Sequence, residues 1–184
     1  EDIGGGIVYA ASSGIISNTI VRDNTANGSL DRGGGGIAIW NSNVSVNRSL
    51  LFGNTARRGG GLWVQNVSHL YVSNSTITQN TATVRSGGIS QYDWWQNTID
   101  VMNSIVWGND APANPDYGIG EPEINYSLIQ WPTGIGNINS DPLFSEEYSL
   151  SSNSPAIDTG NPDLDGDGDT WEIDMDDQDP DGTR

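Results

Sequence analysis

The chain has 184 residues, with 24 acidic and seven basic side chains, no cysteine and a formal net charge of −17. So acidic a chain lacks the cations that phosphate backbones and anionic membrane surfaces require, which excludes a nucleic-acid partner. No run of about 18 apolar residues is available for membrane insertion, and disulfide or thiol chemistry is excluded. The 24 glycines and 19 asparagines favour an all-β fold with many turns, and seven tryptophans argue against disorder.

An internal repeat begins at the first residues. The motif GGGI at residues 4–7 returns as GGGI, GGGL and GGI at residues 34–37, 59–62 and 87–89. A second motif ends in an asparagine followed by Thr-Ala or Asp-Ala, at Asn24, Asn54, Asn80 and Asn109. These asparagines are separated by 30, 26 and 29 residues. Because both motifs keep the same irregular period, the chain is predicted to consist of stacked structural repeats.

Each repeat contains short segments in which apolar residues alternate. The pairs that lie two residues apart are Ile37 and Ile39, Val44 and Val46, Leu62 and Val64, Leu70 and Val72, and Ile99 and Val101. Alternation indicates strands with one buried side, and such strands bury that side by pairing with their equivalents in the next repeat. The sequence therefore predicts an all-β, right-handed parallel β-helix, or solenoid, with four clear coils and a weaker fifth at residues 124–129.

The recurrent asparagine and glycine residues are predicted to form the corners of the coils. Asparagine tolerates the left-handed backbone conformation of a tight corner, and stacked asparagine side chains can hydrogen-bond along a column. We interpret these residues as structural rather than as ligands.

The glycine blocks and the F/V-x-x-N-x-A blocks resemble the repeats of secreted bacterial surface proteins with the right-handed β-helix fold, including the polymorphic outer-membrane adhesins. The segment GNINSDPLF at residues 136–144, followed by YSLSSNSPAIDTGNPD at residues 148–163, is similar to the terminal coil and exit segment of such proteins. The resemblance implies a secreted or cell-surface location. We expect coils over residues 1–144, an exit or capping segment over 145–162 and acidic loops over 163–184.

A search for catalytic residues gives little. Hydrolysis of polysaccharides would require two carboxylates on neighbouring coils, but Asp23 is the one acid in its row, and Asp100, which aligns with Ser45 and Tyr71, is expected to stand alone. His69 alternates with the inward-facing Leu70 and is expected to face solvent. We therefore expect no catalytic activity; a polysaccharide lyase or hydrolase remains the alternative.

Aromatic residues are predicted to line one outer face of the column. Trp40 and Trp63 follow inward-facing residues and should point outward, and Tyr92, Trp94 and Trp95 lie at the matching stretch of the next coil. Tryptophan and tyrosine rings stack on sugars and pack against partner proteins. The strip is a candidate surface for polysaccharide or protein; packing beneath an adjacent loop is the other interpretation.

The acidic segment DLDGDGDTWEID has the spacing of a calcium loop. Its acids at loop positions 1, 3, 5, 7 and 12 are Asp163, Asp165, Asp167, Asp169 and Asp174, and Gly168 stands at position 6, where such loops turn sharply. A second DxDxDG motif follows with Asp177, Asp179 and Asp181. We expect calcium to order this segment; a disordered acidic tail is the alternative.

These features together predict a non-catalytic, extracellular structural and adhesive module stabilised by calcium. The chain begins without methionine or an apolar leader, so we expect a mature or excised piece of a longer secreted polypeptide. An open solenoid exposes strand edges at both ends. We therefore expect either self-association head to tail, into a fibre or surface layer, or continuation into neighbouring coils of a longer parent chain. A glycan-binding module is the third interpretation.

Overall fold

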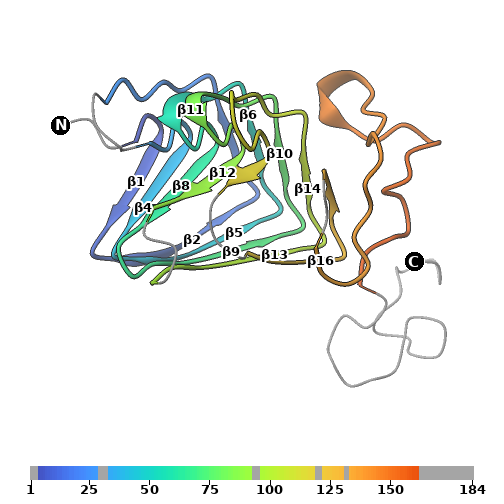
Figure 1. Cartoon of the computed structure of the whole chain (residues 1–184). Coiled ribbons are helices and arrows are strands. Elements are labelled where there is room, and N and C mark those ends of the chain that lie inside the picture. Colours follow the sequence, from blue (N-terminus) through green and yellow to red (C-terminus); the bar gives the residue numbers. More distant parts are fainter. Residues whose placement is uncertain (1–3, 29–32, 93–95, 119–121, 131–132, 162–184) are drawn as a thin grey trace.

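The computed structural model describes residues 4–28, 33–92, 96–118, 122–130 and 133–161. In these residues the chain winds into a three-sided column of parallel sheets, a parallel β-solenoid (Figure 1). The predicted all-β parallel β-helix is therefore confirmed. The acidic loops expected at residues 163–184 lie outside the described residues.

Each side of the column is a five-stranded sheet in which a strand pairs in parallel with its equivalents in the adjacent coils. The first sheet contains β1 (Ile7–Ala10), β4 (Ile37–Trp40), β8 (Leu62–Gln65), β12 (Ile89–Gln91) and β15 (Tyr117–Gly118). The second contains β2 (Ser13–Ser17), β5 (Asn43–Asn47), β9 (His69–Ser73), β13 (Thr98–Met102) and β16 (Glu123–Asn125). The third contains β3 (Ile20–Arg22), β6 (Leu50–Phe52), β10 (Thr76–Thr78), β14 (Ile105–Trp107) and β17 (Leu128–Ile129). A smaller sheet joins β7 (Thr55–Arg58) to β11 (Thr81–Arg85).

The core runs along the axis of the column. Val46, Val72 and Val101 are in register on adjacent strands and are at most 1% exposed, as their alternation predicts. Tyr9 and Tyr117 pack against the two ends of this core. The ring of Tyr9 lies against Gly14, where a Cβ atom would stand 2.3 Å from Tyr9 Cε1. Glycine at position 14 thus makes room for an aromatic ring across the first coil.

Three rows of polar side chains run along the corners, and we call them ladders. The first serine ladder contains Ser12, Ser42 and Ser68 and ends at Asn97. The second begins at Thr19, continues through Ser49, Ser75, Ser104 and Ser127, and ends at Asn137. The asparagine ladder contains Asn24, Asn54, Asn80 and Asn109 and ends at Asp116. At each step a backbone N–H donates to a side-chain oxygen of the following coil, which satisfies backbone groups that the corner removes from the sheets.

The structure confirms the predicted stacking of the ladder asparagines, but these asparagines do not themselves adopt the left-handed corner conformation. The amides are stacked and hydrogen-bonded, Asn54 Nδ2 lying 2.9 Å from Asn80 Oδ1. However, the left-handed backbone belongs to the residue before each asparagine, with φ values of 56° at Asp23, 65° at Gly53, 51° at Gln79 and 68° at Gly108. The asparagine itself is needed for its buried amide, which must align with its neighbours, while the preceding residue makes the turn.

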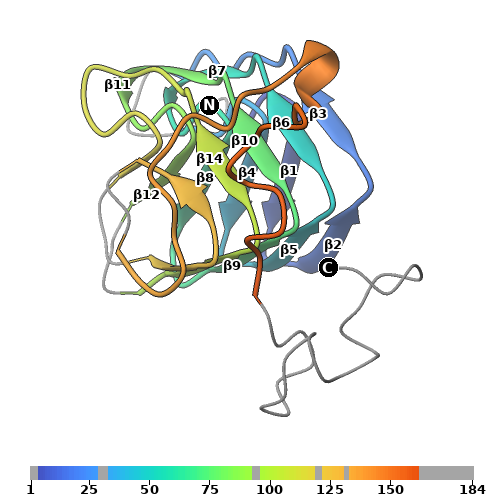
Figure 2. The same cartoon turned by 90° about the vertical axis from the view of Figure 1, so that its right-hand side faces the viewer.

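After β17 the chain leaves the column. Ile138 forms a bridge with Leu128 at the end of the third sheet, and the segment then returns along the outer face of that sheet (Figure 2). A short 3₁₀ helix, η1 (Glu146–Tyr148), brings the Tyr148 ring within 4.6 Å of the Phe52 ring centroid. Farther along, Asn161 N donates to Asn103 Oδ1 at 2.8 Å. The exit segment is thus held against several coils.

Candidate functional site

Of the five residues in the predicted aromatic strip, Trp40 and Tyr92 are described and at least partly exposed, and they lie in one row across the coils. Trp40 is paired with Gln65 on the adjacent strand, and Tyr92 follows in the next coil, where its N–H donates to the carbonyl of Val64. Trp40 is 39% exposed and Tyr92 is half-buried. Two coils separate these rings, about 10 Å at the usual strand spacing. Trp94 and Trp95 lie outside the described residues.

Trp63 is buried, only 1% exposed, so the expectation that it is available on the surface is wrong. It occupies an outward row between Ala38 and Ser90, two small residues that leave space for its ring. The glycine loops close over that space. A Cβ atom on Gly33 would lie 3.0 Å from Trp63 Cδ1, and one on Gly59 would lie 3.0 Å from Trp63 Cβ. Trp63 therefore packs beneath a loop, as the alternative interpretation held.

A polar groove lies at the corner between the first and second sheets, directly after Trp40. It has a volume of about 320 Å³ and is lined mainly by polar residues, Ser12, Ser13, Asn41, Ser42 and Asn43. The groove exists because the corner of the third coil contains one residue more than that of the second. Asn66 and Val67 are both left-handed, with φ of 63° and 56°, and Val67 is 59% exposed and lines the groove.

Two amide side chains of this groove are available for a ligand, whereas Ser42 is buried and its hydroxyl donates to Trp40 O. Asn41 and Asn43 are exposed, and their amides make no hydrogen bond to any described residue. Trp40 directly precedes Asn41 in the chain but does not itself line the groove. An aromatic ring can stack on the C–H groups of a sugar while nearby amide and hydroxyl groups satisfy its hydroxyls. Sequence patterns did not reveal the groove, since it depends on the different corner lengths of adjacent coils.

The outer face of the second sheet contains an acidic pair that we did not expect. Asp100 pairs with Tyr71 as predicted, but on its other side it pairs with Glu123 of β16, so it is not alone. His69 is exposed, as expected, and its Nε2 lies 2.5 Å from Asp100 Oδ2. Tyr71 is 37% exposed beside them. Two carboxylates on adjacent strands meet one requirement of a glycosidase.

Asp116 is a buried acid with a structural partner. It is 4% exposed, and this burial raises the pKa of its carboxyl group, against the lowering effect of hydrogen bonds from the Asn109 side chain and from the backbone N–H groups of Asn109 and Gln130. Its Oδ2 has no hydrogen-bond partner among the described residues. The group lies inside a corner of the column, away from the outer faces, and terminates the asparagine ladder.

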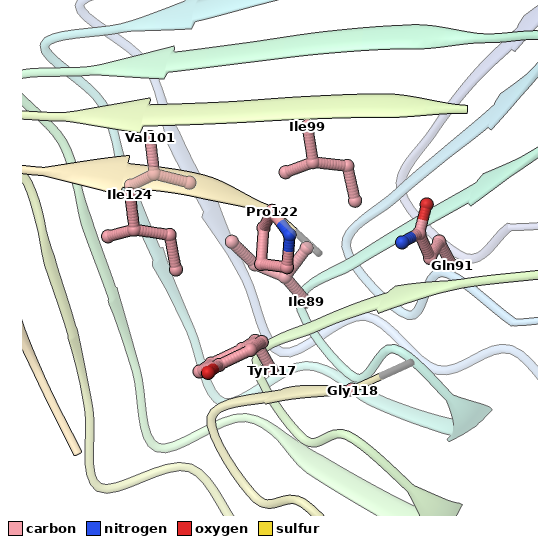
Figure 3. Close-up of a pocket in the computed structure, with 8 residues that line it drawn as sticks. All are labelled: Ile89, Gln91, Ile99, Val101, Tyr117, Gly118, Pro122 and Ile124. Carbon is pink, nitrogen blue, oxygen red and sulfur yellow. The ribbon is translucent and has the colours of Figure 1, made fainter. Parts of the chain in front are cut away.

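A small cavity lies in the core at the C-terminal end of the column. Ile89, Tyr117, Pro122 and Ile124 line it together with Gln91 (Figure 3). Its volume of about 10 Å³ is at the lower limit of the space that one water molecule needs. It is therefore a packing defect where the coils become irregular and has no room for an organic ligand.

The predicted calcium ligands, from Asp163 to Asp181, lie outside the described residues. Within the described ranges no three acidic or histidine side chains come together in a way that could hold a metal ion. None of the helices in that part of the chain is long and apolar enough to span a bilayer. Comparison with protein-family models, curated proteins and solved structures finds no match for this chain.

Proposed function

We propose that the chain is a non-catalytic structural and adhesive module of a secreted or cell-surface protein, and that it binds neutral polysaccharide at the groove beside Trp40. Two observations carry the proposal: the exposed amides of Asn41 and Asn43 line the groove, and the exposed Trp40 directly precedes Asn41 in the chain. The ladders support it, because they hold the groove on a rigid frame and a preformed site needs little ordering when it binds. A net charge of −17 disfavours acidic polysaccharides.

Affinity electrophoresis in gels containing neutral polysaccharide tests this proposal. Trp40→Ala should raise the mobility and reduce apparent affinity roughly two- to tenfold, because a stacked ring contributes about 0.5–1.5 kcal/mol. The matched control is Tyr71→Ala, since Tyr71 is 37% exposed and Trp40 39%, but on different sheets. If both variants are retarded as strongly as the parent chain, the groove is not the binding site.

Calcium is proposed to order the acidic segment at residues 163–184, where the loop spacing begins at Asp163. Calcium offsets the repulsion among closely spaced carboxylates. Isothermal titration of the full chain should detect binding that is lost in the Asp165→Asn, Asp167→Asn double variant. An equally acidic control is Asp110→Asn, Asp141→Asn, which removes the same charge from exposed positions in other parts of the chain. Equal binding by both double variants would contradict the loop assignment.

A polysaccharide hydrolase is the second candidate, favoured by the register of Asp100 with Glu123. Neighbouring coils are about 4.8 Å apart, near the separation of about 5–5.5 Å at which retaining glycosidases hold their two carboxyl groups. An assay for new reducing ends distinguishes it from the adhesive module. Activity that disappears in both Asp100→Asn and Glu123→Gln would replace our first proposal with this one.

A further inference from the structure

The two ends of the column differ in their hydrogen bonds. All three ladders have the same polarity, since each coil donates backbone N–H groups to side-chain oxygens of the coil that follows. The ladder oxygens of the first coil, Ser12 Oγ, Thr19 Oγ1 and Asn24 Oδ1, therefore point toward the N-terminal end. No described residue donates a hydrogen bond to any of them.

Backbone groups of the first coil are open in the same direction. In the second coil, Asn43, Leu50 and Thr55 donate their N–H groups to the first coil. Their register partners in the first coil are Ser13, Ile20 and Thr25, whose N–H groups face the same end and have no described acceptor. Unpaired strand edges of this kind are templates for a further strand.

The edge strands also have exposed aliphatic side chains on their outer faces. Val8 on β1 is 47% exposed, Ile15 on β2 is 74% exposed and Ile20 on β3 is 64% exposed. Each edge strand thus contributes one aliphatic side chain to the rim. These side chains lie in outward rows, so a strand paired with each edge would shield part of their surface, which is favourable.

At the C-terminal end the edge of the third sheet is occupied, while β15 and β16 are the last described strands of the other two sheets. Asn97, Asn137 and Asp116 terminate the ladders, and Ile138 already pairs with β17. A second copy stacked head to tail would therefore meet β3 with a strand whose edge is occupied. The matching partner is a coil that has three open edges.

We propose that the N-terminal end is the docking surface for one more parallel three-strand coil of the same type, supplied by another polypeptide segment. Its backbone N–H groups donate to Ser12 Oγ, Thr19 Oγ1 and Asn24 Oδ1, and its carbonyls accept from Ser13, Ile20 and Thr25. This inference does not rest on polysaccharide binding, because the ladder polarity and the open N–H groups carry it, although Ser12 and Ser13 also line the groove.

The probe is the chain's own second coil, residues 34–58, inserted between residues 3 and 4 of the full chain. This junction preserves the left-handed glycine that begins each of these coils, Gly4 at φ 77° and Gly34 at φ 83°. Amide hydrogen exchange of Ser13, Ile20 and Thr25 should slow about tenfold or more relative to the parent chain. The control insertion has the same residues in scrambled order and should leave these rates unchanged.

A double-mutant comparison tests the ladder itself. Ser12→Ala should leave the melting temperature of the parent chain nearly unchanged but lower that of the extended chain, because only there does the hydroxyl accept a hydrogen bond. Unchanged exchange in the extended chain, with Ile77 still protected as a marker of the folded column, would overturn the proposal. Protection of Ser13 in the parent chain that appears with dimerisation in sedimentation would also overturn it, in favour of a second copy.

Discussion

The carboxylate of Asp116 accepts hydrogen bonds from both nitrogens of Asn109, at 3.1 Å from the backbone N and 2.9 Å from Nδ2. By its backbone, however, Asp116 is the equivalent of Gly61 and Gly88 in the earlier coils. Its carbonyl accepts from the N–H of Ile89, the first residue of β12, just as the Gly88 carbonyl accepts from the N–H of Leu62. A Cβ atom on Gly88 would lie 2.9 Å from Asn109 Nδ2. Position 88 must therefore be glycine, because the amide of Asn109 occupies the space beside it. In the fifth coil the ladder ends, and the carboxylate of Asp116 itself takes the place of the next ladder asparagine.

We predict that Asp116→Asn makes the protein more stable at neutral pH by about 1 kcal/mol. The amide keeps the acceptor for Asn109, and its Nδ2 could donate to Val106 O, continuing the series in which asparagine amides donate to Val21, Leu51 and Ile77 carbonyls. Burial raises the pKa of Asp116 above 3.8. Its contribution to stability is therefore fully present below pH 3.8 and is lost as the pH rises through the folded-state pKa.

Urea unfolding at a series of pH values measures this effect. The free-energy difference between Asp116→Asn and the parent chain should grow from pH 3.5 toward neutrality, the direction that a raised pKa requires. The exposed Asp110 provides the control, because Asp110→Asn removes the same charge from the surface. A difference that shrinks with rising pH would show that the buried carboxylate stabilises the corner.

Asn80→Ala is predicted to be one of the most destabilising substitutions in the column, by about 3 kcal/mol. Asn80 is fully buried, and its amide donates to Leu51 O and Asn109 Oδ1 and accepts from Asn54. Removing it leaves buried polar groups unpaired on both neighbouring coils. The same change at Asn24, which is half-buried and bonded on one side, should cost about 1 kcal/mol. Equal losses in urea unfolding would contradict the ladder interpretation.

The fold could be predicted because its causes repeat along the chain. Alternating residues such as Val46 and Val72 reveal buried strands, and the ladder asparagines reveal the period. The partner of Asp100 could not be found in this way, because the coils shorten toward the end. Ser75 and Ser104 are 29 residues apart, but Ser104 and Ser127 only 23. A fixed period therefore places Glu123 in the wrong row.

The burial of Trp63 escaped prediction for a different reason. Alternation gives the side of the sheet on which a residue lies, and Trp63 does lie on the outer side. Whether that side is covered depends on its neighbours in register, Ala38 and Ser90, and on the approach of the Gly33 backbone. Small residues in the same row of adjacent coils are the signal, but they can be recognised only after the register is known.

Two left-handed glycines should respond differently to the same substitution. Gly108 has a φ of 68° and space around it, the nearest atom to an added Cβ being 3.7 Å away. Gly59 has a φ of 60°, but its Cβ would lie 2.2 Å from Leu62 O. Asparagine tolerates the left-handed region, so Gly108→Asn should change the unfolding free energy by less than about 0.5 kcal/mol. Gly59→Asn should cost about 3 kcal/mol, as measured by urea unfolding; similar values for both would refute the steric argument.

Tyr148 is predicted to hold the exit segment on the third sheet. Its ring lies 4.6 Å from the Phe52 centroid and 5.9 Å from that of Phe144, and its hydroxyl donates to Gln79 Oε1 at 2.7 Å. Tyr148→Ala should release the segment, since aromatic pairs contribute about 0.5–1.5 kcal/mol each beyond their buried area. Limited proteolysis should then cleave within residues 140–161 at least several times faster, while β6 and β10 remain protected.

The conservative variant Tyr148→Phe separates the ring from the hydroxyl. It keeps both ring contacts and loses the bond to Gln79, an exposed hydrogen bond of small net value. Cleavage should therefore remain close to that of the parent chain. If Tyr148→Phe is cut as fast as Tyr148→Ala, the hydrogen bond and not ring packing retains the segment. If neither variant differs from the parent, the attachment depends on other contacts, of which the bond from Asn161 to Asn103 is the next to test.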